Sequence, residues 1–175
     1  MDLTQNYFAL FGLPEAFAVD TTVLGERYRQ LQAETHPDRF AGGTDQERRL
    51  AQQGASLVND AYETLKSPHR RARYLLDLLG APVDDRRPLP PHFLIEQMEL
   101  REELAAARGA DDPMDTVEGV LAEVRRVVKG MSGELAAAFD EGGADALARA
   151  AEITLKMQFF LKLEEDALKL EEEFY

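Results

Sequence analysis

The sequence contains no cysteine. The chain therefore has no disulfide framework, no thiol nucleophile and no thiolate that could hold zinc or an iron–sulfur cluster, and we expect it to carry no cofactor. Its three histidines, His36, His69 and His92, lack the helical spacing of a metal-binding pair. A nucleophile elbow and a phosphate-cradling Gly-Lys-Ser/Thr loop are also missing. These absences argue against an enzyme.

Positive charge is scarce as well. The chain has 20 Lys and Arg against 33 Asp and Glu, which gives a formal charge of −13. Nucleic acids and anionic membranes need clustered cations, so neither is expected as the main partner. No apolar run approaches the roughly 18 residues that cross a bilayer. The first six residues carry an acid and no base, unlike a signal or transit peptide, and we expect a cytoplasmic protein.

The remaining composition is that of a folded protein, with 45% hydrophobic and 30% charged residues in a chain of 175. Charge is unevenly distributed, because the chain through Leu75 carries 10 acids and 9 bases and the rest carries 23 acids and 11 bases. A segment rich in proline and glycine separates the two parts. We therefore predict an N-terminal unit over residues 1–79, a linker over 80–91 and a C-terminal unit over 92–175.

Helix boundaries recur along the chain, whereas sustained two-residue alternation does not. Residues that cap helices (Asp, Ser, Thr) and residues that end them (Pro, Gly) divide the chain into helical segments. Thr44 and Glu47 have the spacing of a capping box, and Ser67-Pro68 can open another helix. We predict an all-α protein with helices over about 7–11, 21–36, 45–66, 68–79, 91–108, 113–141 and 145–173.

The tripeptide His36-Pro37-Asp38 lies between two of these helices. Pro37 ends the first helix, which leaves His36 near the negative helix end and Asp38 outside the hydrogen-bond ladder. A carboxylate on a rigid turn can accept the planar fork of a partner's arginine. The tripeptide also fits a simple helix-ending turn whose histidine satisfies a carbonyl, and by itself it does not decide between the two interpretations.

The surrounding residues favour a binding role. Tyr28-Arg29-Gln30-Leu31 precedes the tripeptide, and Ala61-Tyr62-Glu63-Thr64-Leu65, followed by Ser67-Pro68, comes about two dozen residues after it. Over residues 7–79 the chain resembles the J-domain family, in which two antiparallel helices present His-Pro-Asp where they meet. The resemblance implies a co-chaperone that binds a DnaK-family ATPase and stimulates its ATP hydrolysis.

The same resemblance implies which residues contact the chaperone. They are the tripeptide and the basic residues that flank it: His36, Pro37, Asp38, Arg27, Arg29 and Arg39. The chain departs from the family at Glu26, Glu34 and Thr35, where many J domains have lysine, lysine and tyrosine. The positive face is weaker as a result, which favours a dedicated chaperone over a general one.

The segment from Phe93 to Leu104 shows two apolar stripes when it is projected at about 100° per residue. Phe93, Gln97, Leu100 and Leu104 form one stripe. Leu94, Ile95 and Met98 form the other, bordered by Glu99 and Glu102. A helix between two neighbours in a bundle would bury both stripes. Alternatively, the second stripe is an exposed contact surface with an acidic rim.

A closer resemblance covers nearly the whole chain. Residues 2–14, Arg73-Tyr74-Leu75-Leu76 and the run 93–104 resemble the HscB family, the J-type co-chaperones of iron–sulfur cluster biogenesis. This implies a J domain packed in an L against a C-terminal three-helix bundle. It also implies that the bundle binds the cluster scaffold IscU and delivers it to the specialised chaperone HscA. The scaffold contacts implied are Leu94, Ile95, Met98, Glu99, Glu102 and Phe159.

Two other functions are weighed against this one. A J-domain co-chaperone for a different client would share the tripeptide but would not bind IscU. A non-catalytic helical adaptor would lack the ATPase partner altogether. In each case the chain itself would bind neither cluster nor nucleotide.

Overall fold

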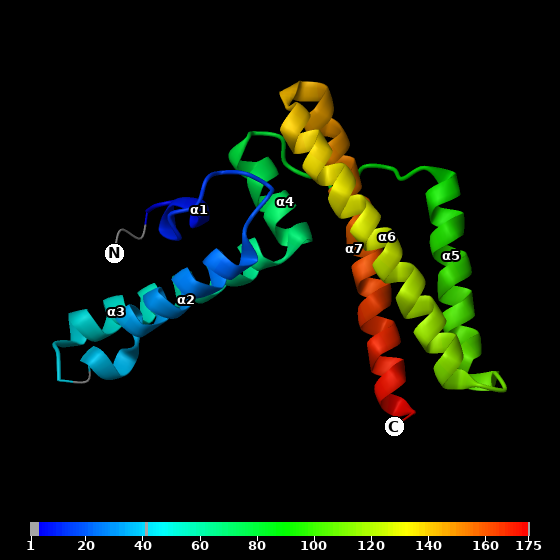
Figure 1. Cartoon of the computed structure of the whole chain (residues 1–175), viewed down its shortest axis with the longest axis horizontal. Helices are drawn as coiled ribbons and strands as arrows, with labels where there is room; N and C mark the ends of the chain where they lie inside the picture. Colours follow the sequence, from blue (N-terminus) through cyan, green and yellow to red (C-terminus); the bar gives the residue numbers. More distant parts are fainter. Residues whose placement is uncertain (1–3, 41, 175) are drawn as a thin grey trace. The chain divides into compact units, whose positions relative to one another are not determined.

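The chain folds entirely into helices over the part that the structure, a computed structural model, describes: residues 4–40 and 42–174, apart from the Pro37 side chain. The predicted contact made by the proline ring of Pro37 thus lies outside the described part. In chain order the elements are α1 (Tyr7–Leu10), α2 (Thr21–Thr35), the 3-10 helix η1 (Pro37–Phe40), α3 (Asp45–Lys66), α4 (Pro68–Leu78), α5 (Pro91–Ala106), the 3-10 helix η2 (Ala107–Gly109), α6 (Pro113–Glu141) and α7 (Gly143–Glu173) (Figure 1). The all-α prediction is confirmed.

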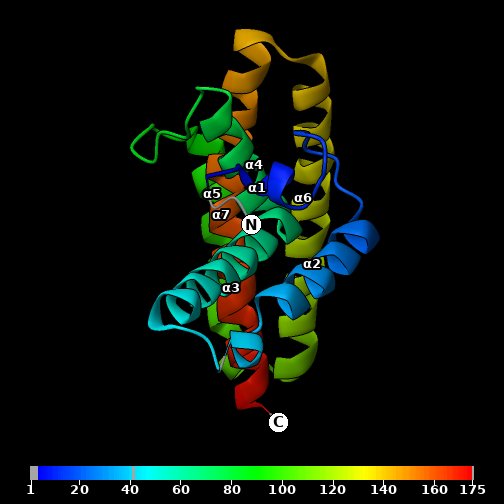
Figure 2. The same ribbon diagram turned by 90° about the vertical axis from the view of Figure 1, so that its left-hand side faces the viewer.

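The helices divide into two compact units, Met1–Leu78 and Leu79–Tyr175. In the first unit α2 and α3 form an antiparallel hairpin, and α1 and α4 pack near its base (Figure 2). The side chain of Asp20 caps α2 by accepting hydrogen bonds from the backbone amides of Thr22 and Val23, at 2.8 and 3.1 Å. The core of the unit consists of buried apolar residues from all four helices, including Phe8, Leu24, Val58, Leu65 and Leu76.

Two contacts join α1 to α4 and α4 to the end of α3. The hydroxyl of Tyr74 on α4 accepts a 2.9 Å hydrogen bond from the backbone N–H of Tyr7, and the two rings stack with centroids 4.4 Å apart. The buried guanidinium of Arg71 donates to the carbonyl of Leu65 at 2.6 Å and lies over the ring of Phe17. Arg71 thereby satisfies one of the carbonyls left unpaired at the end of α3.

In the second unit α6 and α7 form a long antiparallel hairpin, and α5 packs against the half nearest the C-terminus (Figure 1). The turn between them uses Gly142 and Gly143, whose φ angles of 66° and 81° favour glycine. Residues from all three helices form one core, with Phe93, Val117, Val124, Phe160 and Leu163 among its buried members. The predicted three-helix bundle is therefore present.

The structure differs from the predicted helix boundaries after α2, at the end of α5 and at the start of α7. Helix α5 ends at Ala106, where 108 was predicted, and passes into η2. The segment after α2, predicted as a polar loop, contains the 3-10 helix η1. The last helix begins at Gly143, two residues before the predicted Asp145, because both turn glycines reverse the chain without needing a separate loop.

Candidate functional site

The tripeptide lies at the corner between α2 and α3. Helix α2 ends at Thr35, and His36 has the extended backbone angles φ −59° and ψ 128° that residues preceding proline prefer. The hydroxyl of Thr35 is turned inward and donates to the carbonyl of Leu31 at 2.9 Å. Thr35, which stands where many J domains have tyrosine, is therefore buried in a contact with its own helix. It does not belong to an exposed face.

His36 and Asp38 interact with each other and remain open to solvent. The backbone N–H of Asp38 donates to Nδ1 of His36 at 3.3 Å, and a carboxylate oxygen of Asp38 lies 3.6 Å from the same nitrogen. The side chains are 54% and 90% exposed. Nδ1 of His36 thus lies close to both the backbone amide and the carboxylate of Asp38. The corner therefore offers a partner one imidazole ring and one carboxylate.

The three flanking arginines do not form a single face. Arg29 lines a shallow groove with Glu26, Gln30 and Ala33, and Arg39 donates to the carbonyl of Ala33 at 3.3 Å. These two arginines thus share one side of α2.

Arg27 lies on another side of α2. Its guanidinium is 3.5 Å from the side-chain oxygen of Gln30, and it lines a groove with Glu34 and with Ala9 to Gly12 of the first segment. Residues two apart on a helix point in different directions, which explains why Arg27 separates from Arg29. All three arginines are exposed.

The second half of the corner depends on a close packing of Gly43 against the start of α3. Thr44 and Glu47 form the predicted capping box: the Thr44 hydroxyl accepts from the Glu47 amide at 3.2 Å, and Glu47 accepts from the Thr44 amide at 2.7 Å. The backbone and hydroxyl donors of Thr44 lower the pKa of Glu47. A Cβ on Gly43 would lie 2.9 Å from Glu47 Oε2 and 3.2 Å from the Phe40 carbonyl oxygen, so a side chain here would displace the Glu47 carboxylate of the capping box.

An aromatic pair holds the two long helices of the hairpin together behind the corner. The rings of Tyr28 and Tyr62 stack with centroids 4.0 Å apart, and the Tyr28 hydroxyl donates to Asn59 at 2.9 Å. Both tyrosines belong to the segments that carry the J-domain resemblance. Their positions show a bracing role, which the sequence pattern alone did not reveal.

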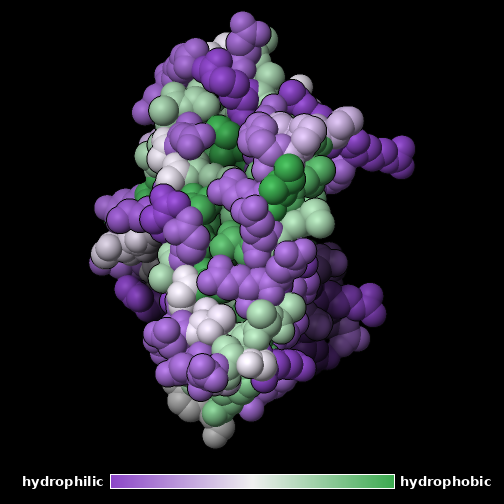
Figure 3. Space-filling model, turned by 90° about the vertical axis from the view of Figure 1, so that its right-hand side faces the viewer, coloured by the Kyte–Doolittle hydropathy of each residue, from purple (hydrophilic) through white to green (hydrophobic). Residues whose placement is uncertain are grey.

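The second candidate surface lies on α5, in the other unit. Leu94, Ile95 and Met98 are 43%, 57% and 59% exposed, the fractions expected of a contact surface and not of a bundle core. Glu99 and Glu102 are exposed beside them. In the space-filling view of the face that carries α5, hydrophobic side chains gather at the centre between hydrophilic ones (Figure 3).

The predicted sixth member of this surface, Phe159 on α7, has a different environment. It is only partly exposed and packs against the bundle core. Its ring meets Phe93 edge to face, with centroids 5.9 Å apart. Phe93, which the sequence pattern assigned to the core, thus holds the Phe159 ring from the buried side. We define the α5 patch as Leu94, Ile95, Met98, Glu99 and Glu102, with Phe159 at its α7 edge.

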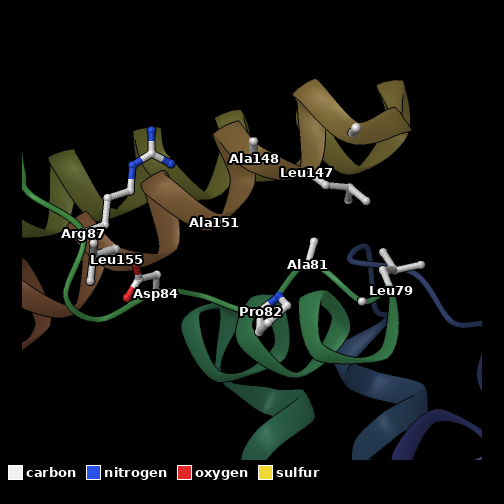
Figure 4. Close-up of a pocket in the computed structure, with 11 residues that line it drawn as sticks. Leu79, Ala81, Pro82, Asp84, Arg87, Leu147, Ala148, Ala151 and Leu155 are labelled. Carbon is white, nitrogen blue, oxygen red and sulfur yellow. The ribbon is translucent and has the colours of Figure 1, made fainter.

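A cavity of about 390 Å³ lies between residues 79–87 and the first half of α7 (Figure 4). Its walls are mainly alanine and leucine side chains, with Asp84 and Arg87 at the edge. Arg87 forms a 3.0 Å ion pair with Glu152, which in turn pairs with Lys156 at 2.7 Å. The Lys156 hydrogen bond is the main cause of the lowered pKa of Glu152. The Arg87–Glu152 ion pair attaches the predicted linker to α7.

No group of three or more histidine, aspartate or glutamate side chains in residues 4–40 and 42–174 is placed to hold a metal ion. Across the same ranges no helix combines the length and hydrophobicity that a membrane span requires.

Comparisons with known proteins agree on one family. A family model described as "HSCB C-terminal oligomerisation domain" matches residues 89–168. The "Co-chaperone protein HscB homolog" of Ralstonia nicotianae is 42% identical over 165 residues, covering 93% of this chain and 92% of that protein.

Solved structures agree with these sequence matches. HscB from Vibrio cholerae superposes with a TM-score of 0.87 at 36% identity, covering 98% of this chain and all of that one. Human HscB gives a TM-score of 0.86 at 34% identity over 97% of this chain and 83% of that one. The open tripeptide corner, the three-helix bundle and these matches lead to one conclusion: the chain belongs to the HscB family of co-chaperones.

Proposed function

We propose that this chain is a cytoplasmic co-chaperone of iron–sulfur cluster biogenesis that binds the scaffold IscU and delivers it to HscA, whose ATPase it stimulates. One observation carries the proposal. Two exposed surfaces of complementary kinds lie in separate units: a polar corner with His36 and Asp38 open to solvent, and the apolar α5 patch with acids beside it. A protein that brings a client to a chaperone needs one surface for each.

The corner suits the chaperone. The Asp38 carboxylate is 90% exposed and can accept a charge-assisted, bidentate hydrogen bond from an arginine of HscA. The exposed imidazole of His36 can hydrogen-bond to the same partner. Arg29 and Arg39, on one side of α2, add positive charge that attracts an acidic surface. We assign His36, Pro37, Asp38, Arg29 and Arg39 to this contact.

Arg27 joins the contact from the other side of α2, where Glu34 is its neighbour.

The α5 patch suits the scaffold. Burying the exposed parts of Leu94, Ile95 and Met98 against a partner supplies the hydrophobic driving force, at about 25 cal/mol per Å². Glu99 and Glu102 stay at the rim, where charges select partners and speed association. Phe159 forms the firm edge of the patch because Phe93 supports its ring.

The chain acts by bringing the two partners together and carries no catalytic group of its own. ATP hydrolysis belongs to HscA. The cluster belongs to IscU, since this chain has no cysteine thiolate to hold one.

The test is HscA turnover measured with this chain and IscU, added separately and together. We expect stimulation well beyond the sum of the separate effects, because one chain holds client and ATPase in the same complex. Additive effects would contradict the delivery role. Pull-down with IscU against unrelated client proteins distinguishes this function from a J-domain co-chaperone for another client.

A further inference from the structure

Helices α5 and α7 run side by side in the same direction, and their junction extends well past the α5 patch. At one end Phe93 meets Phe159, with ring centroids 5.9 Å apart. At the other end Arg108, just beyond α5, forms a 2.5 Å ion pair with Glu173. The patch occupies only the first of these ends.

The second end is a groove of about 450 Å³. Its floor contains three buried leucines, Leu104, Leu163 and Leu170. Its remaining lining is Arg101, Ala105, Arg108, Asp166, Lys169 and Glu173. The groove thus contains three cations and two acids, whereas acids outnumber bases 23 to 11 in the chain after Leu75.

The cations of the groove are only partly neutralised. Arg108 pairs with Glu173, and Lys169 pairs with Glu165 at 2.5 Å. Arg101 donates from Nε to Gln97 of its own helix at 3.2 Å, and that bond leaves its terminal guanidinium nitrogens free to bind a partner. Arg101 and Lys169 are both exposed.

The groove is continuous with the α5 patch. Leu94, Met98, Arg101 and Ala105 are spaced three or four residues apart, which places them in one row along α5. Phe159, Leu163, Asp166 and Leu170 form the matching row on α7. At about 1.5 Å per residue, Arg101 and Arg108 lie about 5 and 15 Å beyond Met98 along the helix.

We propose that this groove is the second half of the scaffold-binding surface and that it takes carboxylate side chains of the scaffold. The inference rests on the proposed function, since the partner is the one that covers the α5 patch. Charge complementarity selects the occupant: a segment whose apolar residues cover Leu94 and Met98 and whose acidic residues follow toward Arg101, Arg108 and Lys169. The α5 patch supplies affinity, and the groove sets the direction in which the scaffold docks.

The experiment compares two charge reversals of equal size. The groove variant is Arg101→Glu with Lys169→Glu. The control variant is Lys129→Glu with Arg149→Glu, which reverses two exposed cations of the same unit that line neither the groove nor the patch. A third variant, Leu94→Ala with Met98→Ala, weakens the α5 patch itself. Circular dichroism checks that each full-length variant is folded.

Affinity and association rate for IscU are then measured at low and high NaCl. We expect the groove variant to bind about three- to tenfold more weakly at low salt, mainly through slower association, and to lose most of the salt dependence seen in the parent chain. The control variant should stay within about twofold of the parent.

The outcomes separate this inference from the proposed function. If the groove variant binds like the control while the α5-patch variant loses affinity, the groove proposal is wrong and the scaffold contact on α5 stands. If the parent chain does not bind IscU, both fail. Sedimentation of the same variants identifies a second copy of this chain as the occupant if the groove variant changes the oligomeric state in place of scaffold affinity, which also overturns the proposal.

Discussion

His36 and Asp38 work as one unit, because the backbone amide and the carboxylate of Asp38 both lie close to Nδ1 of His36, at 3.3 and 3.6 Å. Glutamine in place of His36 keeps a polar side chain but loses the ring. We predict that His36→Gln abolishes stimulation of the HscA ATPase and leaves affinity for IscU unchanged, since the α5 patch lies in the other unit. Steady-state phosphate release and calorimetric titration measure the two effects. His92→Gln, an exposed histidine of the second unit, is the matched control.

Stimulation that survives His36→Gln would show that the tripeptide does not act on the ATPase. At this scale the sequence was informative about residue types and less so about directions. The role of the tripeptide was predicted from the segments on either side of it. The separation of Arg27 from Arg29 was also predictable, because residues two apart on a helix point in different directions. The role of Gly43 depends on a contact with Glu47 and Phe40 that only the folded corner creates.

The start of α3 is held by its capping box, and this box supports the tripeptide corner from the α3 side. Thr44→Ala removes the hydroxyl that accepts from the Glu47 amide, and we predict that it lowers the free energy of unfolding by about 1 kcal/mol. The box also has a pH signature. Because folding lowers the pKa of Glu47, its contribution is complete above the ordinary carboxyl range and is lost as pH falls through the folded pKa.

Denaturant titrations of parent and variant between pH 7 and about pH 3 test this prediction. The difference between the two proteins should shrink as the pH falls. A difference that is constant with pH would mean that Thr44 acts without Glu47. Ser132→Ala, which removes a hydroxyl bonded to a carbonyl of its own helix, is a control for loss of a hydroxyl away from the corner.

Helix ends were predictable because caps, prolines and glycines act over a few residues, as at Asp20, Thr44 and Ser67-Pro68. Whether a whole apolar stripe is exposed or buried was not predictable from the sequence. Both α5 and α7 carry two apolar stripes, yet α5 leaves one exposed while the α7 residues Met157, Phe160 and Leu163 are buried. The reason is tertiary: α7 packs along α6 far more extensively than α5 packs on either of its neighbours, and sequence periodicity does not record how much of a helix its neighbours cover.

The molecule concentrates its negative charge in the unit that carries the α5 patch, and its nearly neutral unit carries the tripeptide. Under the proposed function this division separates the two tasks chemically, because HscA would meet a corner with local positive charge and IscU would meet an apolar surface with an acidic rim. Phe159 cannot be changed without cost to the fold, since it packs on Phe93 in the bundle. A clean loss of scaffold binding therefore requires Leu94→Ala with Met98→Ala, whose side chains are about half exposed.

For the whole chain we predict a specific pattern of coupling. Leu94→Ala with Met98→Ala should keep the parent's stimulation of HscA in the absence of IscU and lose the additional stimulation that IscU provides, whereas His36→Gln should lose both. Combining all three changes should then look like His36→Gln alone, because scaffold recruitment has no effect on turnover without the tripeptide. ATPase assays of the four proteins with and without IscU complete this double-mutant cycle. Additivity of the two defects would mean that the units act independently, and that holding both partners on one chain contributes nothing to the rate.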